Sequence, residues 1–587
     1  MGEMHDDIPI HPDLQSTSVM PPQNNLHVPP RQSLEADHSD YPRRRAIIAC
    51  EICRGRKTRC DGGKPKCRLC TDLGADCVYR EPGQKLDAGD KMIIEQLHRI
   101  EGMLHMMDQT GSLSHGPDDF FHVRREQNVS HATTTYSQPT STLFDEVSNG
   151  PITSNLLAQP QPATAGLSAE LNRTVLPTSS KAMPDLSAIP SRIESYFHRM
   201  HDRHALINPN TWQAVYATAS LSNFSRSIEA CTVLLIAALG SCATDRHLLV
   251  ESTITGEVPG IAFFSRAWSM LPEVMLSNSV SAIHCLVLAS AYFLEIHRPL
   301  DAWNTLNLAT SKLDLQTSSS REQGEAEREQ LKRAFWNTRL MKWSIMTALD
   351  VSNPSDIPPR SSSWSLPSPY QPNVKSDNDN EDISFFLAHV NLQQLAERIS
   401  RTIPKTASNA FNMDAILPVA AEFDDQLSQW YDRLPESLQF PHEGYPAGGP
   451  AQNSLRHGFF ECRAAIFRPF VLALVNNAEL AANHTLTVCC KKCLEASVRQ
   501  IECFLHAGQL GWKTAHDIVA ETLFIVGATT TPALAEMLPP PQDLKARLVD
   551  QVLAELDKVV SVSPALAVKV STLRMAEDKR QELAFGG

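Results

Sequence analysis

The chain has 587 residues, of which 42% are hydrophobic and 20% charged, and its formal net charge is −13. The longest apolar run, residues 230–243, is too short to span a bilayer, so we expect no membrane partner. The first 22 residues are acidic and proline-rich and contain no apolar signal segment, which argues against a secreted, disulfide-rich protein. Residues 1–42 are expected to be disordered.

Six cysteines follow in the pattern C-x2-C-x6-C-x6-C-x2-C-x6-C. They are Cys50, Cys53, Cys60, Cys67, Cys70 and Cys77. This spacing predicts a metal cluster, and two tetrahedral zinc ions need eight thiolate positions, so two of the six sulfurs must bridge. The most symmetric choice bridges through Cys50 and Cys67, the first residue of each C-x2-C-x6-C half.

Three other interpretations of these cysteines are weaker. A disulfide framework requires a secreted context. Two independent four-cysteine ribbons would need eight cysteines here, whereas the other eight of the chain lie beyond residue 230 in apolar helical sequence. A cluster that only stores metal would not need the dense basic residues between the first three cysteines.

Residues 43–81 resemble the DNA-binding domain of fungal zinc binuclear cluster (Zn2Cys6) transcription factors. The resemblance is carried by residues 49–70 (ACEICRGRKTRCDGGKPKCRLC), followed by Gly74, Cys77 and Tyr79. It implies two zinc ions that share two ligands. One ion takes Cys50, Cys53, Cys60 and Cys67, and the other takes Cys67, Cys70, Cys77 and Cys50.

The charge distribution independently indicates a nucleic-acid partner. Residues 43–80 contain eleven Lys and Arg against four Asp and Glu, a sum of +7, which six thiolates and two Zn²⁺ ions reduce to about +5. The rest of the chain therefore sums to about −20, and a small basic module on an acidic chain is typical of nucleic-acid binding proteins. RNA binding would favour aromatic stacking residues among the basic ones, but only Tyr79 is present, so double-stranded DNA is the expected partner.

The resemblance also implies how the module contacts DNA. The residues after the second cysteine are expected to start a short helix, whose C-terminal end points into the major groove at a CGG-type triplet. By position, Lys57 contacts the base edges, with Arg56 beside it. Arg54 and Arg59 contact phosphates. Gly55, inside this helix, is expected to cost about 0.8 to 1 kcal/mol relative to alanine, which zinc binding must offset.

Residues 82–90 are a polar linker, and residues 91–108 are predicted to form a short dimerising coiled-coil helix with apolar residues at heptad spacing. Its core positions are Ile93, Leu97, Ile100, Leu104 and Met107. The family resemblance favours a homodimer, and an ordinary amphipathic helix is the alternative. With only about two heptads and Gly102 on the outer face, dimerisation is expected to be marginal without DNA.

Residues 109–187 are rich in Ser, Thr, Gln, Asn and Pro and lack a sustained period, so a disordered linker is predicted. From residue 188 to 587 the chain changes to long apolar-periodic segments with few strand signals, which predicts a large all-α domain. The strongest predicted helices span residues 191–204, 229–245, 282–297, 328–350, 383–403, 421–435 and 457–480. Loops are expected at 318–324 and 351–382.

The helical region resembles the fungal transcription factor regulatory (middle homology) domain. The motifs that carry this resemblance are Tyr196-Phe197 with His201, Ala237-Leu239-Gly240, Ala302-Trp303, Arg333-Phe335-Trp336, Trp430 with Leu434-Pro435, and Arg468-Pro469-Phe470. In the family, the motif that matches Arg333-Phe335-Trp336 is followed by an acidic residue and then a Gly-Arg-Pro turn. This chain has Lys342 and Asn353-Pro354 in that region.

Two clusters in this region have metal-like or redox-like spacing. The first comprises His484, Cys489, Cys490 and Cys493, and the second His198, His201 and His204. Buried apolar cysteines and a solvated or hydrogen-bonded histidine face are the favoured interpretations. No catalytic residue is predicted, because no nucleophile, base and acid can be joined from the sequence and no phosphate-binding glycine loop is present.

The predicted function is therefore that of a sequence-specific transcription factor of RNA polymerase II type, not an enzyme, which recognises CGG-like half-sites in the nucleus. It is expected to act with the transcription machinery on a metabolic or biosynthetic gene set, with a small-molecule effector as a possible partner. The alternative is a helical metabolite-binding protein or enzyme with an accessory zinc-cluster head that binds nucleic acid.

Overall fold

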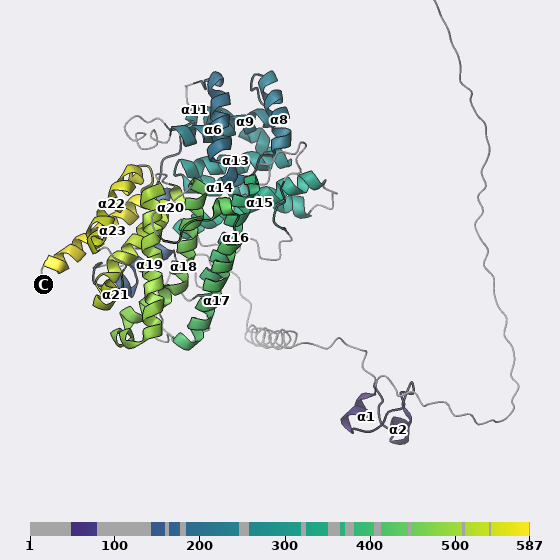
Figure 1. The fold of residues 1–587 in the computed structure, drawn as a ribbon. Coiled ribbons are helices and arrows are strands. Elements are labelled where there is room, and N and C mark those ends of the chain that lie inside the picture. Colours follow the sequence, from purple (N-terminus) through teal and green to yellow (C-terminus); the bar gives the residue numbers. More distant parts are fainter. Residues whose placement is uncertain are drawn as a thin grey trace, which may run out of the picture. The chain divides into compact units, whose positions relative to one another are not determined.

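The computed structural model describes residues 49–78, 142–158, 162, 164–176, 183–245, 258–318, 324–349, 364–369, 381–403, 412–443, 449–507, 511–538 and 542–585. The chain divides into two compact units between residues 131 and 132. We call the described part of the first unit the head (residues 49–78) and that of the second the body (residues 142–585) (Figure 1). The N-terminal segment 1–42, the linker 82–90 and the predicted coiled coil 91–108 lie outside the described residues.

The head contains two one-turn helices, α1 (Glu51–Gly55) and α2 (Arg68–Asp72). Each begins directly after a cysteine, because Cys50 and Cys67 occupy the N-cap positions. The prediction that a helix starts after the second cysteine is wrong: α1 begins at Glu51 and Gly55 is its last residue. The penalty for a glycine in a helix interior therefore does not apply to Gly55.

The body is helical, as predicted, and no strand occurs among its described residues. Its first half comprises α4 (Leu143–Ser148), η1 (Pro151–Thr153), α5 (Ala165–Leu171), η2 (Leu186–Ala188), α6 (Ile189–Arg199), α7 (His201–His204), α8 (Pro209–Leu221), α9 (Ile228–Thr244), α11 (Ile261–Trp268), α12 (Leu271–Leu276), α13 (Val280–Glu295), α14 (Pro299–Ser318) and α15 (Glu325–Leu349). Its second half comprises α16 (Glu381–Thr402), α17 (Met413–Asp432), η4 (Glu436–Leu438), α18 (Pro450–Asn476), η5 (Ala478–Ala482), α19 (His484–Ala507), α20 (Trp512–Ala528), α21 (Pro532–Met537), α22 (Gln542–Val560) and α23 (Pro564–Phe585).

Helix α9 is the central element of the first half, where it packs against α6, α8, α11 and α13 (Figure 1). It is apolar on every face and is buried from Ala230 to Cys242, as expected for a helix surrounded by others. The Ser227 hydroxyl accepts a hydrogen bond from the backbone N–H of Ala230 and so starts the helix. Helix α13 is buried in the same way and is capped by Ser279.

A glycine sets the distance between α6 and α9. A Cβ atom built on Gly240 would lie 1.9 Å from the carbonyl oxygen of Arg192 in α6. No side chain fits there without moving backbone. Gly240 therefore allows the closest approach between the two helices.

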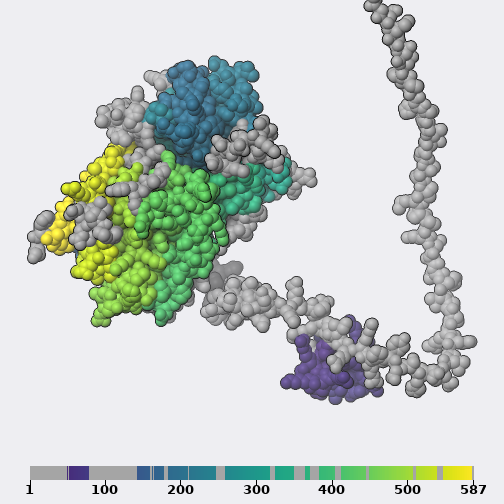
Figure 2. All heavy atoms as spheres, viewed as in Figure 1, coloured from purple at the N-terminus to yellow at the C-terminus, as the bar shows by residue number. Residues whose placement is uncertain are grey.

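The second half of the body is built on the long pair α18 and α19, against which α20 packs, followed by α22 and α23. Its apolar residues join those of the first half in one continuous core that runs from Phe144 to Ala576. Figure 2 shows the two halves, coloured blue to teal and green to yellow, as one mass. A buried ion pair between Arg468 of α18 and Glu521 of α20 crosses this core.

The expectation of a disordered linker over residues 109–187 is wrong for its C-terminal part. Phe144, Val147 and Ile152 are buried in the core of the body. The guanidinium of Arg173 donates to the carbonyl oxygens of His297 and Val562 and so ties α5 to distant parts of the chain. The helices here are only six or seven residues long, too short for a helical period to stand out from polar sequence.

The Arg333-Phe335-Trp336 motif holds the described residues 364–369 of the predicted loop against α15. The guanidinium of Arg333 donates to the carbonyl of Ser368, and the indole N–H of Trp336 donates to that of Ser365. Phe335 stacks on Trp364 with ring centroids 5.8 Å apart.

None of the helices in the described part of the chain has both the length and the apolar character needed to cross a bilayer.

Candidate metal centre and nucleic-acid interface

The six cysteines of the head converge, and their sulfurs form two groups of four. One group is Cys50, Cys53, Cys60 and Cys67, the other is Cys50, Cys67, Cys70 and Cys77, and within each the sulfurs lie within 4.8 Å of one another. The sulfur of Cys50 lies 3.7 Å from that of Cys67 and 3.6 Å from that of Cys70. A tetrahedral site with zinc–sulfur bonds of about 2.3 Å has sulfurs about 3.8 Å apart, so the sulfur spacing fits zinc.

The two halves of the head repeat the same local structure. The backbone N–H of Cys50 donates to the sulfur of Cys60 at 3.5 Å, and that of Cys67 donates to the sulfur of Cys77 at 3.3 Å. These bonds tie the last cysteine of each half to its first. Between the halves, the carboxylate of Asp61 accepts a hydrogen bond from the backbone N–H of Arg68 at 3.1 Å.

The sulfur cluster requires a bound cation. Burial and hydrogen bonds with neighbouring thiols raise the pKa of Cys53 to about 12. Thiolates packed this closely repel one another, so a divalent cation is needed to keep them deprotonated at neutral pH. Cys50, Cys53, Cys67 and Cys70 are fully buried and form the whole core of the head, which contains no other buried hydrophobic residue. The donor set and its spacing therefore fit the two zinc ions expected from the sequence.

The four predicted DNA contacts lie together at and after the end of α1. The side chains of Arg54, Arg56, Lys57 and Arg59 are all exposed. None of them forms an ion pair with a residue that the structure describes. Their positive charge is therefore available to phosphates and base edges.

Lys57 has a backbone conformation that is unusual for its residue type. Its φ angle is +52°, in the left-handed region. The N–H groups of Lys57 and Thr58 donate to the carbonyls of Arg54 and Cys53 at 3.2 and 2.9 Å. These two bonds form a Schellman motif, in which the residue at the position of Lys57 is usually glycine.

The second half of the head ends α2 with the same motif and has glycine at this position. Gly74 has a φ angle of +62°, and the N–H groups of Gly74 and Ala75 donate to the carbonyls of Thr71 and Cys70. Lys57 and Gly74 are thus structurally equivalent. Only the first half carries a long cationic side chain there.

Comparison with known proteins gives the identity of both units. The family model of the fungal Zn(2)-Cys(6) binuclear cluster domain matches residues 48–86. That of the fungal specific transcription factor domain matches residues 193–432. The chain contains both domains of the fungal zinc binuclear cluster transcription factors. It is therefore a DNA-binding regulator of transcription that binds two zinc ions.

Relatives among these transcription factors match either about two thirds or more of the chain or only a short segment of it. The transcription factor ecdB of Aspergillus rugulosus is 23% identical over 474 residues, which cover 74% of this chain and 80% of ecdB. Transcription factor FBD3 of Gibberella moniliformis is 23% identical over 68% of this chain and 64% of its own length. The depudecin biosynthesis cluster-specific transcription activator DEP6 of Alternaria brassicicola is 41% identical over 71 residues, 12% of this chain and 11% of its own. No solved structure is significantly similar to the chain.

The two other clusters considered in the sequence do not form metal sites among the described residues. Cys489, Cys490 and Cys493 are buried in the core, as favoured, and burial raises the pKa of each thiol. His201 is buried, whereas His204 lies within hydrogen-bonding distance of the amide of Asn337. Helix α6 also ends between His198 and His201, so the three-residue spacing does not place the histidines on one helix face.

Proposed function

We propose that this zinc binuclear cluster factor recognises CGG-like half-sites, with Lys57 and the neighbouring Arg56 at the base edges and Arg54 and Arg59 on phosphates. The observation that carries the proposal is the left-handed backbone at Lys57. A non-glycine residue in this conformation costs of order 1 kcal/mol, and such residues concentrate at functional sites. Lysine can donate to O6 and N7 of guanine, which suits a G-containing triplet.

The ligand assignment proposed with it has Cys50 and Cys67 bridging the two zinc ions. The sharing of these two sulfurs between the four-sulfur groups supports it. Both residues are also N-caps of their helices, so bridging sulfurs would fix α1 against α2.

The test is a gel shift on duplexes with CGG or with a scrambled triplet, using the full chain and Lys57→Gly. We expect the variant to keep both zinc ions but to lose about 10- to 100-fold in discrimination between the duplexes, since a good base contact contributes about 1 to 3 kcal/mol. Lys66→Gly is the control, because Lys66 is exposed and pairs with Asp76. Discrimination that survives in Lys57→Gly would contradict the proposed base contact.

We also propose a homodimer held by Ile93, Leu97, Ile100, Leu104 and Met107. Heptad spacing and the family support this, while the residues themselves lie outside those described. Mixing the chain with a longer tagged copy on a duplex with two half-sites should give a third band of intermediate mobility. Leu97→Asp should remove that band, and its persistence would contradict the coiled-coil dimer.

The proposed setting is the nucleus, with the transcription machinery as partner and a metabolic or biosynthetic gene set as target. The biosynthetic role named for DEP6 supports the proposed gene set. We further propose that the body binds a small-molecule effector. Genome-wide occupancy of the tagged protein tests the gene set. A gel shift with a zinc chelator tests the function itself: DNA binding that the chelator does not affect would favour the alternative, an enzyme or metabolite-binding protein with an accessory head.

A further inference from the structure

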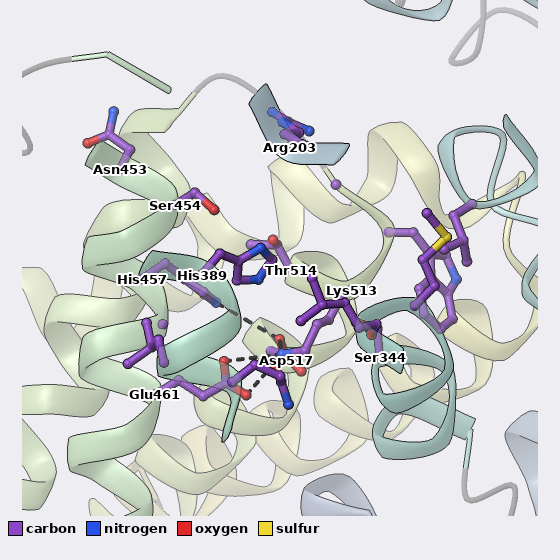
Figure 3. A pocket seen from close by; sticks show the side chains of 18 of the residues that line it. Arg203, Ser344, His389, Asn453, Ser454, His457, Glu461, Lys513, Thr514 and Asp517 are labelled. Atoms are coloured by element: carbon purple, nitrogen blue, oxygen red, sulfur yellow. Dashed lines mark hydrogen bonds and ion pairs between the residues drawn. The ribbon is translucent and has the colours of Figure 1, made fainter. Parts of the chain in front are cut away.

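The body contains a cavity of about 280 Å³ lined by residues of α7, α13, α15, α16, α18, α19 and α20. Its volume is close to the lower end of the range of roughly 300–1,000 Å³ typical of small-molecule sites. One part of the wall is apolar and includes Leu340, Met341 and Phe504. The rest is polar: Figure 3 shows Lys513 between Glu461 and Asp517, with the ring of His457 directed toward Asp517. Sequence reasoning did not bring these residues together, because His457 and Glu461 lie on α18, Lys513 and Asp517 lie on α20, and no local pattern links the two helices.

The cavity wall contains buried polar atoms that have no hydrogen-bond partner among the residues that the structure describes. They include the indole N–H of Trp512, Nδ1 of His457, Nδ1 of His389 and Oδ1 of Asn453. Trp512 is only 4% exposed and His457 9%. A buried donor or acceptor without a partner costs about 1 to 3 kcal/mol, so these atoms are suited to a bound molecule that supplies the missing bonds.

The charged groups that line the cavity do not balance. Three carboxylates, those of Glu295, Glu461 and Asp517, face two cations, Arg203 and Lys513. Arg203 lies 3.8 Å from Glu295, which leaves Lys513 shared between Glu461 and Asp517. Within the described lining, one negative charge therefore has no cation of its own.

Two histidines of the cavity, His389 and His204, do not supply the missing positive charge. Burial lowers the pKa of His389 to about 4 and also lowers that of His204, so both are neutral at pH 7. His457 is 4.0 Å from Asp517, beyond hydrogen-bond distance. The excess negative charge thus favours a ligand that brings a cation.

A metal ion fits this place less well than an organic cation. His457, Glu461 and Asp517 have their potential ligand atoms within 4.8 Å of one another. The ammonium of Lys513, however, already lies 2.9 and 3.1 Å from the two carboxylate oxygens of Glu461 and also donates to Asp517. A metal ion would need direct bonds of about 2.0 to 2.2 Å to these carboxylate oxygens in place of the Lys513 ammonium. An amine can share the carboxylates with Lys513, because each has about four lone-pair sites for hydrogen bonds.

We propose that this cavity binds a small amphipathic amine, with its protonated nitrogen toward the Glu461 and Asp517 carboxylates and its hydrocarbon part against the apolar wall. This proposal names the chemical class of the small-molecule effector, and its role in regulation rests on the proposed function. Trp512 donates to an acceptor group of the ligand. Asn453 accepts from a donor group.

Three probes of matched shape test the ligand class by calorimetry on the full chain: cyclohexylmethylamine, cyclohexylmethanol and cyclohexanecarboxylate. We expect saturable binding of the amine about tenfold or more tighter than that of the alcohol, because a charge-assisted hydrogen bond is roughly twice as strong as a neutral one. The carboxylate should not bind. Equal or tighter binding of the alcohol or the carboxylate, or no saturable binding of the amine, would overturn the proposal.

Two variants test the site. Asp517→Asn leaves Lys513 paired with Glu461 alone, so the amine should lose its tenfold advantage over the alcohol. Ser454→Trp, at an exposed position of the lining, should block both the amine and the alcohol without disturbing the core. Asp557→Asn is the matched control, because Asp557 forms an exposed ion pair with Arg574 and does not line the cavity. Unchanged amine affinity in both cavity variants would place binding elsewhere and refute the site.

Calorimetry requires no DNA, so its outcome is independent of the gel shift that tests the proposed function. A gel shift on CGG duplexes with and without cyclohexylmethylamine completes the test. Amine binding without DNA binding would refute the CGG proposal and retain the cavity. DNA binding without amine binding would refute the cavity and retain the CGG proposal.

Discussion

The head and the body are stabilised by opposite means. The buried core of the head consists of four cysteines, whereas that of the body is a continuous apolar cluster from Phe144 to Ala576. A structural zinc site contributes about 10 to 16 kcal/mol in small peptides, enough to fold a segment that has no apolar core. The head therefore needs few residues for its fold, and α1 can expose its basic side chains to DNA.

The largest effect that distinguishes the two regions should come from the cysteines. Cys67→Ala removes a sulfur common to both four-sulfur groups, so we expect loss of both zinc ions and at least about a 1,000-fold loss of DNA affinity, consistent with the zinc contribution to folding. Zinc content by mass spectrometry and a gel shift measure this. All eight tryptophans lie between residues 212 and 512, so tryptophan fluorescence reports the body alone and should show an unchanged unfolding transition.

Cys493→Ala is the matched change in the body. Cys493 is also fully buried, but it belongs to the apolar core. We expect this variant to lower the unfolding transition of the body and to keep both zinc ions and full DNA affinity. Loss of zinc from Cys493→Ala, or its retention in Cys67→Ala, would break the contrast between the regions.

The next largest effect should come from the charge buried in the body. Glu521→Gln leaves the guanidinium of Arg468 without its carboxylate partner. Burial opposes the charge on Arg468, and Glu521 raises its pKa above the usual value. Breaking a buried pair from one side costs about 3 to 5 kcal/mol, to be measured by urea unfolding.

Glu582→Gln is the control for Glu521→Gln. Glu582 is 68% exposed and pairs with Lys579, which lies three residues earlier on the surface of α23. Surface pairs of this kind contribute about 0 to 1 kcal/mol, so the control should unfold at nearly the same urea concentration as the parent chain. Equal effects of the two substitutions would show that Arg468 is not stabilised by Glu521.

The two regions also differ in how far the sequence predicted them. The cysteine count predicted that two sulfurs of the head are shared, and the family resemblance implied the two sulfur groups. The helices of the body were predicted from their periodicity, but not the contacts between them. Arg173, for example, bonds to the carbonyls of His297 and Val562, and no local pattern links residues so distant in the chain.

Two local details of the head were also beyond the sequence. The start of α1 at Glu51 depends on the N-cap position of Cys50, and cysteine is not among the residues preferred there. The left-handed conformation of Lys57 follows from the Schellman motif at the end of α1. The repeat of the C-x2-C-x6-C half was the available signal, because it aligns Lys57 with Gly74.

A smaller difference is expected between alanine substitutions at two glycines, one in the body and one in the head. Gly240→Ala places a methyl group against the carbonyl of Arg192, so we expect it to destabilise the body by about 2 kcal/mol through overpacking. Gly55→Ala meets nothing within 4 Å and should leave zinc content and DNA affinity unchanged. Thermal unfolding followed by tryptophan fluorescence measures the first variant. An unaltered transition in Gly240→Ala would mean that α6 and α9 can move apart freely.

The last effect vanishes at neutral pH, grows as the pH is lowered and should be confined to the body. Burial lowers the pKa of His284 to about 4 from an unfolded value of 6.5, and its ring nitrogen Nε2 lies 3.2 Å from the carbonyl oxygen of Gln330. Between these two values the unfolded chain binds a proton that the folded chain does not, so stability falls as the pH is lowered from 6.5 to 4. This histidine contributes about 1.4 kcal/mol per pH unit to that loss. His284→Gln retains a donor for the carbonyl and should reduce the slope of unfolding free energy against pH by this amount, while above pH 7 the two curves should run parallel. An identical slope below pH 6.5 in both proteins would show that His284 takes up its proton in the folded body.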